Sequence, residues 1–101
     1  MDIEKTIEEY KKAGFSDYQL NEIKTGLEHG VDVSKYDNKA YLAIQMRQIR
    51  FGLEENLDVS WYAGRQFDWF QMEEIRVGLE KGLDVSCYAY ENYPYDVMRE
   101  I

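Results

Sequence analysis

The sequence predicts an all-α fold, a short helical-repeat array in which each 26-residue unit supplies one long helix and one short helical turn. Two observations predict this fold. The chain repeats with a constant period of 26 residues, and nine of the 26 positions are identical in three full copies, without insertion or deletion. Within each copy, apolar residues recur at offsets of three and four, which is the spacing of one face of an α-helix.

The chain of 101 residues divides into three full copies between two shorter segments. A chain of this length fits one domain. One copy cannot bury its apolar face alone, whereas stacked copies can, so the shorter segments are expected to cap the two ends. The predicted parts are an N-terminal capping helix in residues 1–14, repeats at 15–40, 41–66 and 67–92, and a partial fourth repeat at 93–101.

Each copy marks where its long helix begins. Ser16 and Asp68 suit the N-cap, and a glutamine three residues later completes a capping-box pattern. Copy two has Leu42 at the cap position, so its helix start is expected to be weaker, and copy four has Pro94, which is tolerated at a helix start. The apolar faces are formed by Leu20, Ile23 and Leu27, by Met46, Ile49 and Leu53, and by Met72, Ile75 and Leu79.

Each copy also marks where this helix ends. Gly30, Asn56 and Gly82 suit the left-handed position that follows a helix. The aspartate two residues later is expected to cap a second, short helical turn that carries valine, serine and tyrosine. Each unit should therefore contain a helix of about 13 residues, roughly 20 Å long, followed by that turn.

A glycine recurs inside each predicted helix, at Gly26, Gly52 and Gly78. Glycine in a helix interior costs roughly 0.5–1 kcal/mol relative to alanine, so its recurrence indicates that another group packs closely against it. We expect the ring of the tyrosine ten residues later, or the next helix, to lie there. Fraying near the helix end is the alternative explanation.

Composition and residue usage argue against several functions. The 20 acidic and 12 basic residues give a formal net charge of −8, which does not favour direct binding to nucleic acid. The single histidine, His29, is expected to cap a helix C-terminus at the surface, and the single cysteine, Cys87, has no recurring basic neighbour to activate it. The Asp-Val-Ser segments lack the ligand pattern of a calcium loop. We therefore expect no enzymatic activity, no metal and no cofactor.

The sequence also predicts a cytoplasmic location. The first residues lack the basic and apolar regions of a secretory signal. No apolar stretch approaches the roughly 20 residues that a membrane span needs. A free cysteine suits a reducing compartment, so neither export nor membrane contact is expected.

Unusual side chains at variable positions are the candidates for partner binding. Clustered aromatic residues beside an arginine are typical interface anchors, although rings that fill gaps between units are the alternative. The predicted partner-binding residues are Phe51, Trp61, Arg65, Trp69 and Phe70, and the predicted acidic surface comprises Glu73, Glu74, Glu80 and Asp96. Residues 67–101 hold 8 acidic and 3 basic residues. Such a surface suits a basic protein or simply confers solubility.

One segment of the chain resembles a known type of repeat. The segment QMEEIRVGLEKGLDVSCYA is similar to tandem repeats of the form QMxEIRxGLExGLDVSxYA, which occur in plasmid and conjugative-element proteins of gut-type Firmicutes, sometimes beside antirestriction domains. The resemblance covers residues 15–101 and carries no chemistry with it. It implies an anti-defence protein from a mobile element, for instance an anti-CRISPR inhibitor.

Two functions are expected from the residues and the resemblance together. The first is a non-enzymatic inhibitor that occludes the nucleic-acid-binding surface of a basic bacterial defence effector, such as a CRISPR nuclease or a restriction enzyme. The second is a passive adaptor or self-assembly module without inhibitory activity, which would allow homo-oligomers. Both are protein-binding functions.

Overall fold

The computed structural model describes residues 2–100, and within them every element of secondary structure is a helix, so the predicted all-α class is confirmed. Met1 and Ile101, at the two ends of the predicted capping segments, lie outside these residues. The elements in chain order are α1 (Ile3–Lys12), α2 (Asp17–Glu28), the short 3-10 turn η1 (Val33–Lys35), α3 (Ala43–Glu54), η2 (Val59–Trp61), α4 (Trp69–Glu80), η3 (Val85–Cys87) and α5 (Tyr95–Glu100).

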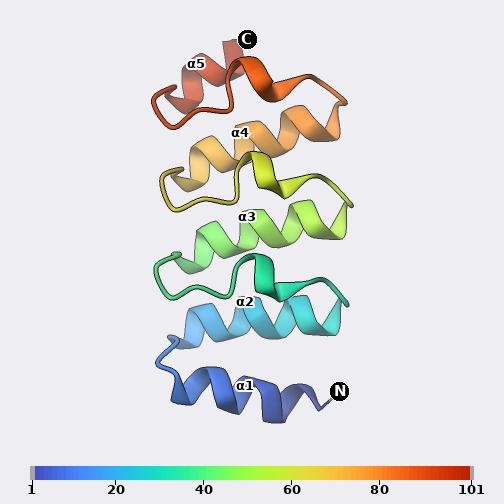
Figure 1. The fold of residues 1–101 in the computed structure, drawn as a ribbon, viewed down its shortest axis with the longest axis vertical. Helices are drawn as coiled ribbons and strands as arrows, with labels where there is room; N and C mark the ends of the chain where they lie inside the picture. Colours follow the sequence, from blue (N-terminus) through green and yellow to red (C-terminus); the bar gives the residue numbers. More distant parts are fainter. Residues whose placement is uncertain (1, 101) are drawn as a thin grey trace.

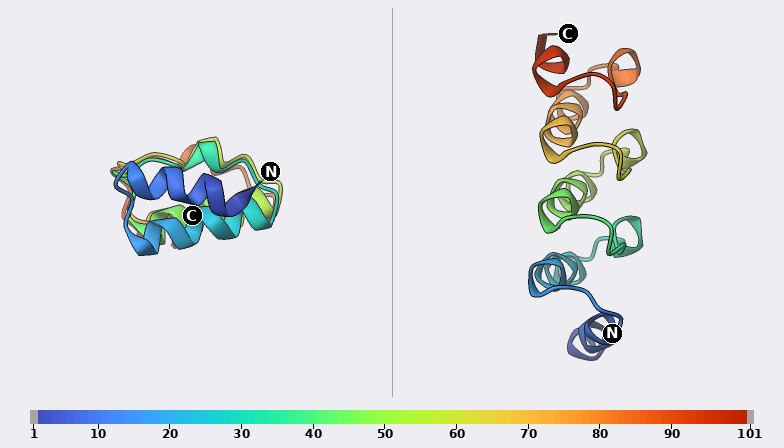
Figure 2. Two further views of the ribbon diagram at one scale, coloured as in Figure 1. Left: turned by 90° about the horizontal axis from the view of Figure 1, so that it is seen from below. Right: turned by 90° about the vertical axis from the view of Figure 1, so that its left-hand side faces the viewer.

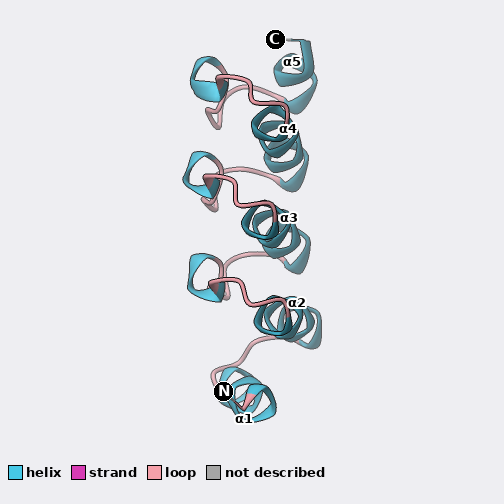
Figure 3. Ribbon diagram, turned by 90° about the vertical axis from the view of Figure 1, so that its right-hand side faces the viewer, coloured by secondary structure: helices cyan, strands magenta, loops and turns pink. Residues whose placement is uncertain are grey.

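The helices stack one above another along a rod of 44 × 22 × 15 Å, with the two termini at opposite ends (Figure 1). Each helix packs mainly on its neighbours in the chain, and α2, α3 and α4 also pack on the 3-10 turn that follows them. Seen from the side, α2 to α5 form one column and the 3-10 turns a second column beside it, while α1 is displaced toward the turns at the N-terminal end (Figures 2 and 3). We call the side of the helix column that points away from the turns the helical face.

The predicted helix starts are confirmed, including the weaker one. Ser16 Oγ accepts a hydrogen bond from the backbone N–H of Gln19, and the Gln19 side chain accepts one from the backbone N–H of Ser16 at 2.9 Å. Asp68 and Gln71 form the same reciprocal pair at 2.8 and 2.9 Å. Leu42 receives only the glutamine half of the box, because its side chain has no acceptor.

The capping glutamines have a second role, which the sequence did not reveal. Gln19 Nε2 also donates to the backbone carbonyls of Lys39 and Tyr41, at 3.0 and 2.7 Å, where the next repeat begins. Gln45 donates in the same way to the carbonyl of Phe67 at 2.7 Å. We call this contact the glutamine clasp. It explains why glutamine recurs even in copy two, where no side chain completes the capping box.

The helix ends follow the predicted pattern. Gly30, Asn56 and Gly82 have φ angles of 75°, 59° and 74°, which is the left-handed region. The residue after each of them donates its N–H to the carbonyl of the helical glycine at 2.9–3.0 Å, which closes a Schellman motif. An aspartate then caps each 3-10 turn by accepting from the backbone N–H of the serine two residues later.

The recurring helical glycine is explained by the tyrosine ring, as predicted. A Cβ on Gly26, Gly52 or Gly78 would lie less than 3.0 Å from the hydroxyl oxygen of the tyrosine ten residues later. Tyr36 and Tyr62 donate these buried hydroxyl groups to backbone carbonyls of their own repeat's helix, at 2.8 and 2.7 Å. Burial raises the pKa of both phenols well above the ordinary value. The close approach fixes each turn onto its helix and builds the core between the two columns.

Candidate protein-binding site

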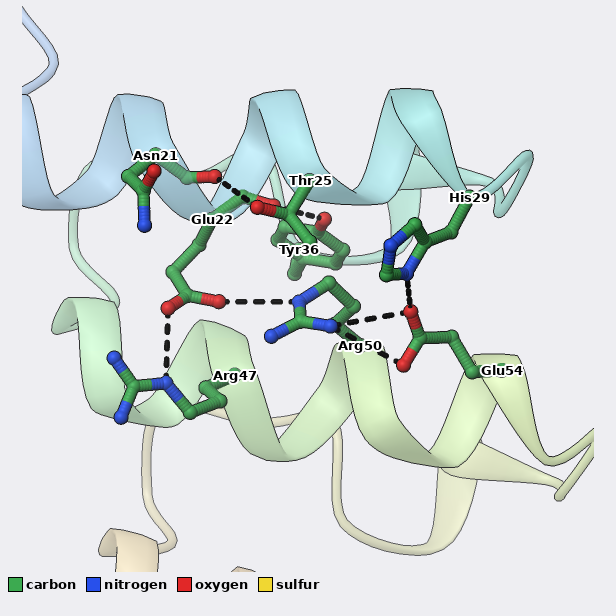
Figure 4. Close-up of polar contacts among 8 residues, drawn as sticks. All are labelled: Asn21, Glu22, Thr25, His29, Tyr36, Arg47, Arg50 and Glu54. Carbon is green, nitrogen blue, oxygen red and sulfur yellow. Dashed lines mark hydrogen bonds and ion pairs between the residues drawn. The ribbon is translucent and has the colours of Figure 1, made fainter.

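Successive helices meet along the helical face through ion pairs, and we call each meeting line a seam. At the α2–α3 seam Glu22 is almost fully buried and accepts from Arg47 Nε at 2.9 Å and from Arg50 Nε at 3.1 Å (Figure 4). Arg50 also donates to Glu54 at 3.1 Å, and His29 contacts the same carboxylate. Burial alone would raise the pKa of Glu54, but the hydrogen bond from His29 and the charge of Arg50 hold it below its ordinary value.

The α3–α4 seam has the same layout with different charges. Gln48 replaces the buried glutamate and accepts from Arg76 Nε at 2.9 Å. Arg76 also pairs with Glu80 at 2.6 Å and lies 3.5 Å from Glu55, which stands where the first seam has its histidine. Two carboxylates therefore share one guanidinium. A hydrogen bond with Glu80, together with burial, raises the pKa of Glu55 above 4.5.

Replacing Glu55 by glutamine is expected to stabilise the protein by about 0.5 kcal/mol at pH 7, because it removes a like-charge contact with Glu80. A carboxyl whose folded pKa is raised contributes most stability at low pH, and that contribution is lost as the pH rises past 4.5. The gain from Glu55→Gln should therefore vanish near pH 4. Urea unfolding at both pH values measures this difference. An equal gain at both values would contradict the raised pKa.

Phe51, a predicted anchor, belongs to the seams. The Arg50 and Arg76 guanidinium carbons lie 5.0 and 5.3 Å from its ring centroid, so the partly buried ring contacts two cations. Carboxylates of the seams hold both of these arginines. The ring therefore takes part in joining the repeats.

Aromatic rings gather instead where α4 and α5 begin. Trp69 stacks on Phe70 with ring centroids 3.7 Å apart, and Phe70 stacks on Tyr95 at 4.9 Å. Arg99 continues the series, 5.6 Å from the Tyr95 centroid, and is held by Glu74 at 2.9 Å. We call the three rings the aromatic stack. Phe70 and Tyr95 are 40% and 38% exposed, so the stack remains open to a partner.

Carboxylates flank the aromatic stack. Asp68 precedes Trp69 in the chain, Glu73 follows Trp69 by one helical turn, and Asp96 is next to Tyr95. Gln71 of α4 donates to the backbone carbonyl of Glu91 at 2.9 Å, which places the backbone of this fourth acidic residue at the start of α4. Within residues 2–99, none of these four acids forms a salt bridge with a lysine or arginine.

The other predicted residues lie elsewhere. Trp61 is 39% exposed but belongs to η2, in the column of turns, so it is separated from the aromatic stack. Arg65 is exposed in the loop between η2 and α4. Glu74 and Glu80 are engaged by Arg99 and Arg76. Of the four predicted acidic residues, Glu73 and Asp96 are the two near the stack that form no ion pair with the described residues.

Sequence analysis missed Tyr95, Asp68 and Glu91 as members of this site. Tyr95 could have been found, because it lies one period of 26 residues after Trp69. The position of Glu91 depends on the glutamine clasp, for which the sequence offered no signal. The resulting site is a partly exposed aromatic stack on one edge of the helix column, near four acidic residues that form no salt bridge within residues 2–99.

The protein is thus a small all-α protein built from stacked helical repeats. Comparison with family models, curated proteins and solved structures gave no match. Among the described residues, no helix has both the length and the apolar character needed to cross a membrane.

Proposed function

We propose that the chain is a non-enzymatic protein-binding module that covers the nucleic-acid-binding surface of a basic bacterial defence effector, such as a CRISPR nuclease or a restriction enzyme. The observation that carries the proposal is the partly exposed aromatic stack near four acidic residues that form no ion pair within residues 2–99. Aromatic side chains supply contact area at interfaces. Carboxylates that lack cations in their own protein can meet the lysines and arginines that otherwise bind phosphates.

The overall charge supports the same proposal. A net charge of −8 repels nucleic acid and attracts a basic protein over distances near the Debye length, about 8 Å at physiological salt. Such attraction speeds association more than it tightens the final complex. The repeat's resemblance to proteins of mobile elements supports a defence effector as the partner. A rod of stacked helices supplies a rigid support for the site.

The proposal is tested by competition on purified effectors. We expect the protein to reduce DNA binding and cleavage by at least one RNA-guided nuclease or restriction enzyme, and to do so less as the salt concentration rises. The double variant Trp69→Ala/Phe70→Ala should lose this effect. Tyr18→Ala is the matched control, because Tyr18 is an exposed aromatic residue at the start of α2.

Three outcomes would contradict the proposal. If every purified effector kept its full nuclease activity in the presence of the protein, the inhibitory function would be contradicted. A complex that forms while the effector still binds its nucleic acid would point to the passive adaptor instead. Equal loss of inhibition in the Tyr18 control and the double variant would move the binding site away from the aromatic stack.

A further inference from the structure

One position on the helical face changes its charge between repeats. Arg47 on α3 and Arg99 on α5 occupy the same place in the 26-residue period, and each pairs with an acid of the preceding helix at 2.9 Å. In α4 this place is taken by Glu73. The α3 residue opposite it is Gln48, whose side-chain oxygen is already bound by Arg76. Glu73 therefore has no counterpart across its seam.

Glu73 lies beside the aromatic stack. It follows Phe70 by three residues and Trp69 by four, and these spacings place side chains next to each other on a helix. It is partly buried and, in the part of the chain described, makes no salt bridge. A carboxylate and partly exposed aromatic rings are thus brought together, and no lysine or arginine within residues 2–99 pairs with this carboxylate.

Elsewhere on this face, rings and carboxylates are joined by arginine. The Phe51 ring meets Arg50, which is held by Glu22 and Glu54. The Tyr95 ring meets Arg99, which is held by Glu74. Each contact pairs one guanidinium with a ring and a carboxylate. Beside Glu73 the ring and the acid are present, but the nearest guanidinium, that of Arg99, is already paired with Glu74, and among the described residues no arginine pairs with Glu73.

We propose that Glu73, with Trp69 and Phe70, binds an arginine side chain of the basic partner. This inference rests on the proposed function and specifies the chemistry of its contact. Arginine fits better than lysine, because its planar guanidinium stacks on a ring while donating two parallel hydrogen bonds to a carboxylate. Lysine carries the same charge on a compact ammonium and makes only the Coulombic part of the contact.

The test uses hexa-arginine and hexa-lysine peptides as probes of equal charge. In a Trp61→Phe background the fluorescence of Trp69 reports binding near the site. We expect hexa-arginine to bind about tenfold more tightly than hexa-lysine, the scale of one ring contact plus one paired hydrogen bond. Glu73→Gln should weaken hexa-arginine binding about tenfold. Glu28→Gln, an exposed acid on α2, makes the same charge change and should leave binding within about twofold.

Glu73→Arg is the second variant. Because α3 and α5 already carry arginine at this place, the fold should accept it, and circular dichroism and urea unfolding should match those of the parent protein. Hexa-arginine binding should be lost. Equal affinity for the two peptides, or equal weakening by Glu73→Gln and Glu28→Gln, would overturn the arginine site. Effector inhibition that persists alongside such a result would leave the proposed function standing.

Discussion

Glu22→Ala is expected to lower the free energy of unfolding by about 3 kcal/mol, because it breaks a buried charge network from one side. Glu22 is only 2% exposed and accepts hydrogen bonds from Arg47 and Arg50. Arg50 is itself nearly buried, so losing this carboxylate leaves part of its guanidinium without a partner or water. Glu54 still neutralises some of that charge, which keeps the expected cost at the lower end for such networks.

Glu22→Gln is the matched control for this experiment. The protein already uses glutamine at the equivalent place, where Gln48 accepts a hydrogen bond from Arg76 at 2.9 Å. The amide should therefore keep one hydrogen bond at the α2–α3 seam and cost about 1 kcal/mol. Urea unfolding followed by circular dichroism measures both variants. Equal costs for alanine and glutamine would show that the buried carboxylate network does not hold the seam.

Gly52→Ala is expected to destabilise the protein by about 2 kcal/mol, the scale of overpacking a core. Helix propensity alone predicts the opposite sign, a gain of about 1 kcal/mol. The added methyl group would collide with the hydroxyl oxygen of Tyr62 and lie 2.7 Å from Val59 Cγ1. The ring can move away only by giving up the hydrogen bond that it donates to the Gln48 carbonyl.

A double-mutant cycle separates this collision from other effects. In a Tyr62→Phe background the hydroxyl group is absent, so Gly52→Ala should cost about 1 kcal/mol less than in the parent. Contact with Val59 remains, so the cost should not disappear. Unfolding free energies of the parent, the two single variants and the double variant complete the cycle. A stabilising Gly52→Ala would mean that propensity outweighs packing at this position.

Much of the repeat unit could be predicted because its signals are local. Helix caps, left-handed residues and apolar spacing depend on residues that are close in sequence. Each of these signals recurs in all or most of the three copies. The contact of Tyr36 with Gly26 could also be predicted, because a glycine that recurs inside the helix of every copy indicates a group packed closely against it. The sequence therefore predicts the helix, the turn and the packing of one on the other.

The contacts between repeats could not be predicted in the same way. Glu22 reaches arginines 25 and 28 residues away, and the sequence did not indicate which helix faces meet. The candidate site was predicted in part for the same reason. Trp69 and Phe70 lie in one stack, whereas Trp61 lies in the other column and Phe51 joins two seams. Residues close in sequence were separated because the chain alternates between two columns.

The glutamine clasp has a consequence for how such a protein can grow. Each glutamine donates to the backbone carbonyl of the first residue of the following copy, and a backbone carbonyl is present whatever side chain stands there. An in-frame duplication of one internal copy would therefore recreate working junctions without compensating mutations. Each added copy would lengthen the protein by about 10 Å, the usual spacing of packed helices. Recombination between copies thus offers an evolutionary route to longer or shorter homologues whose exposed residues are free to diverge.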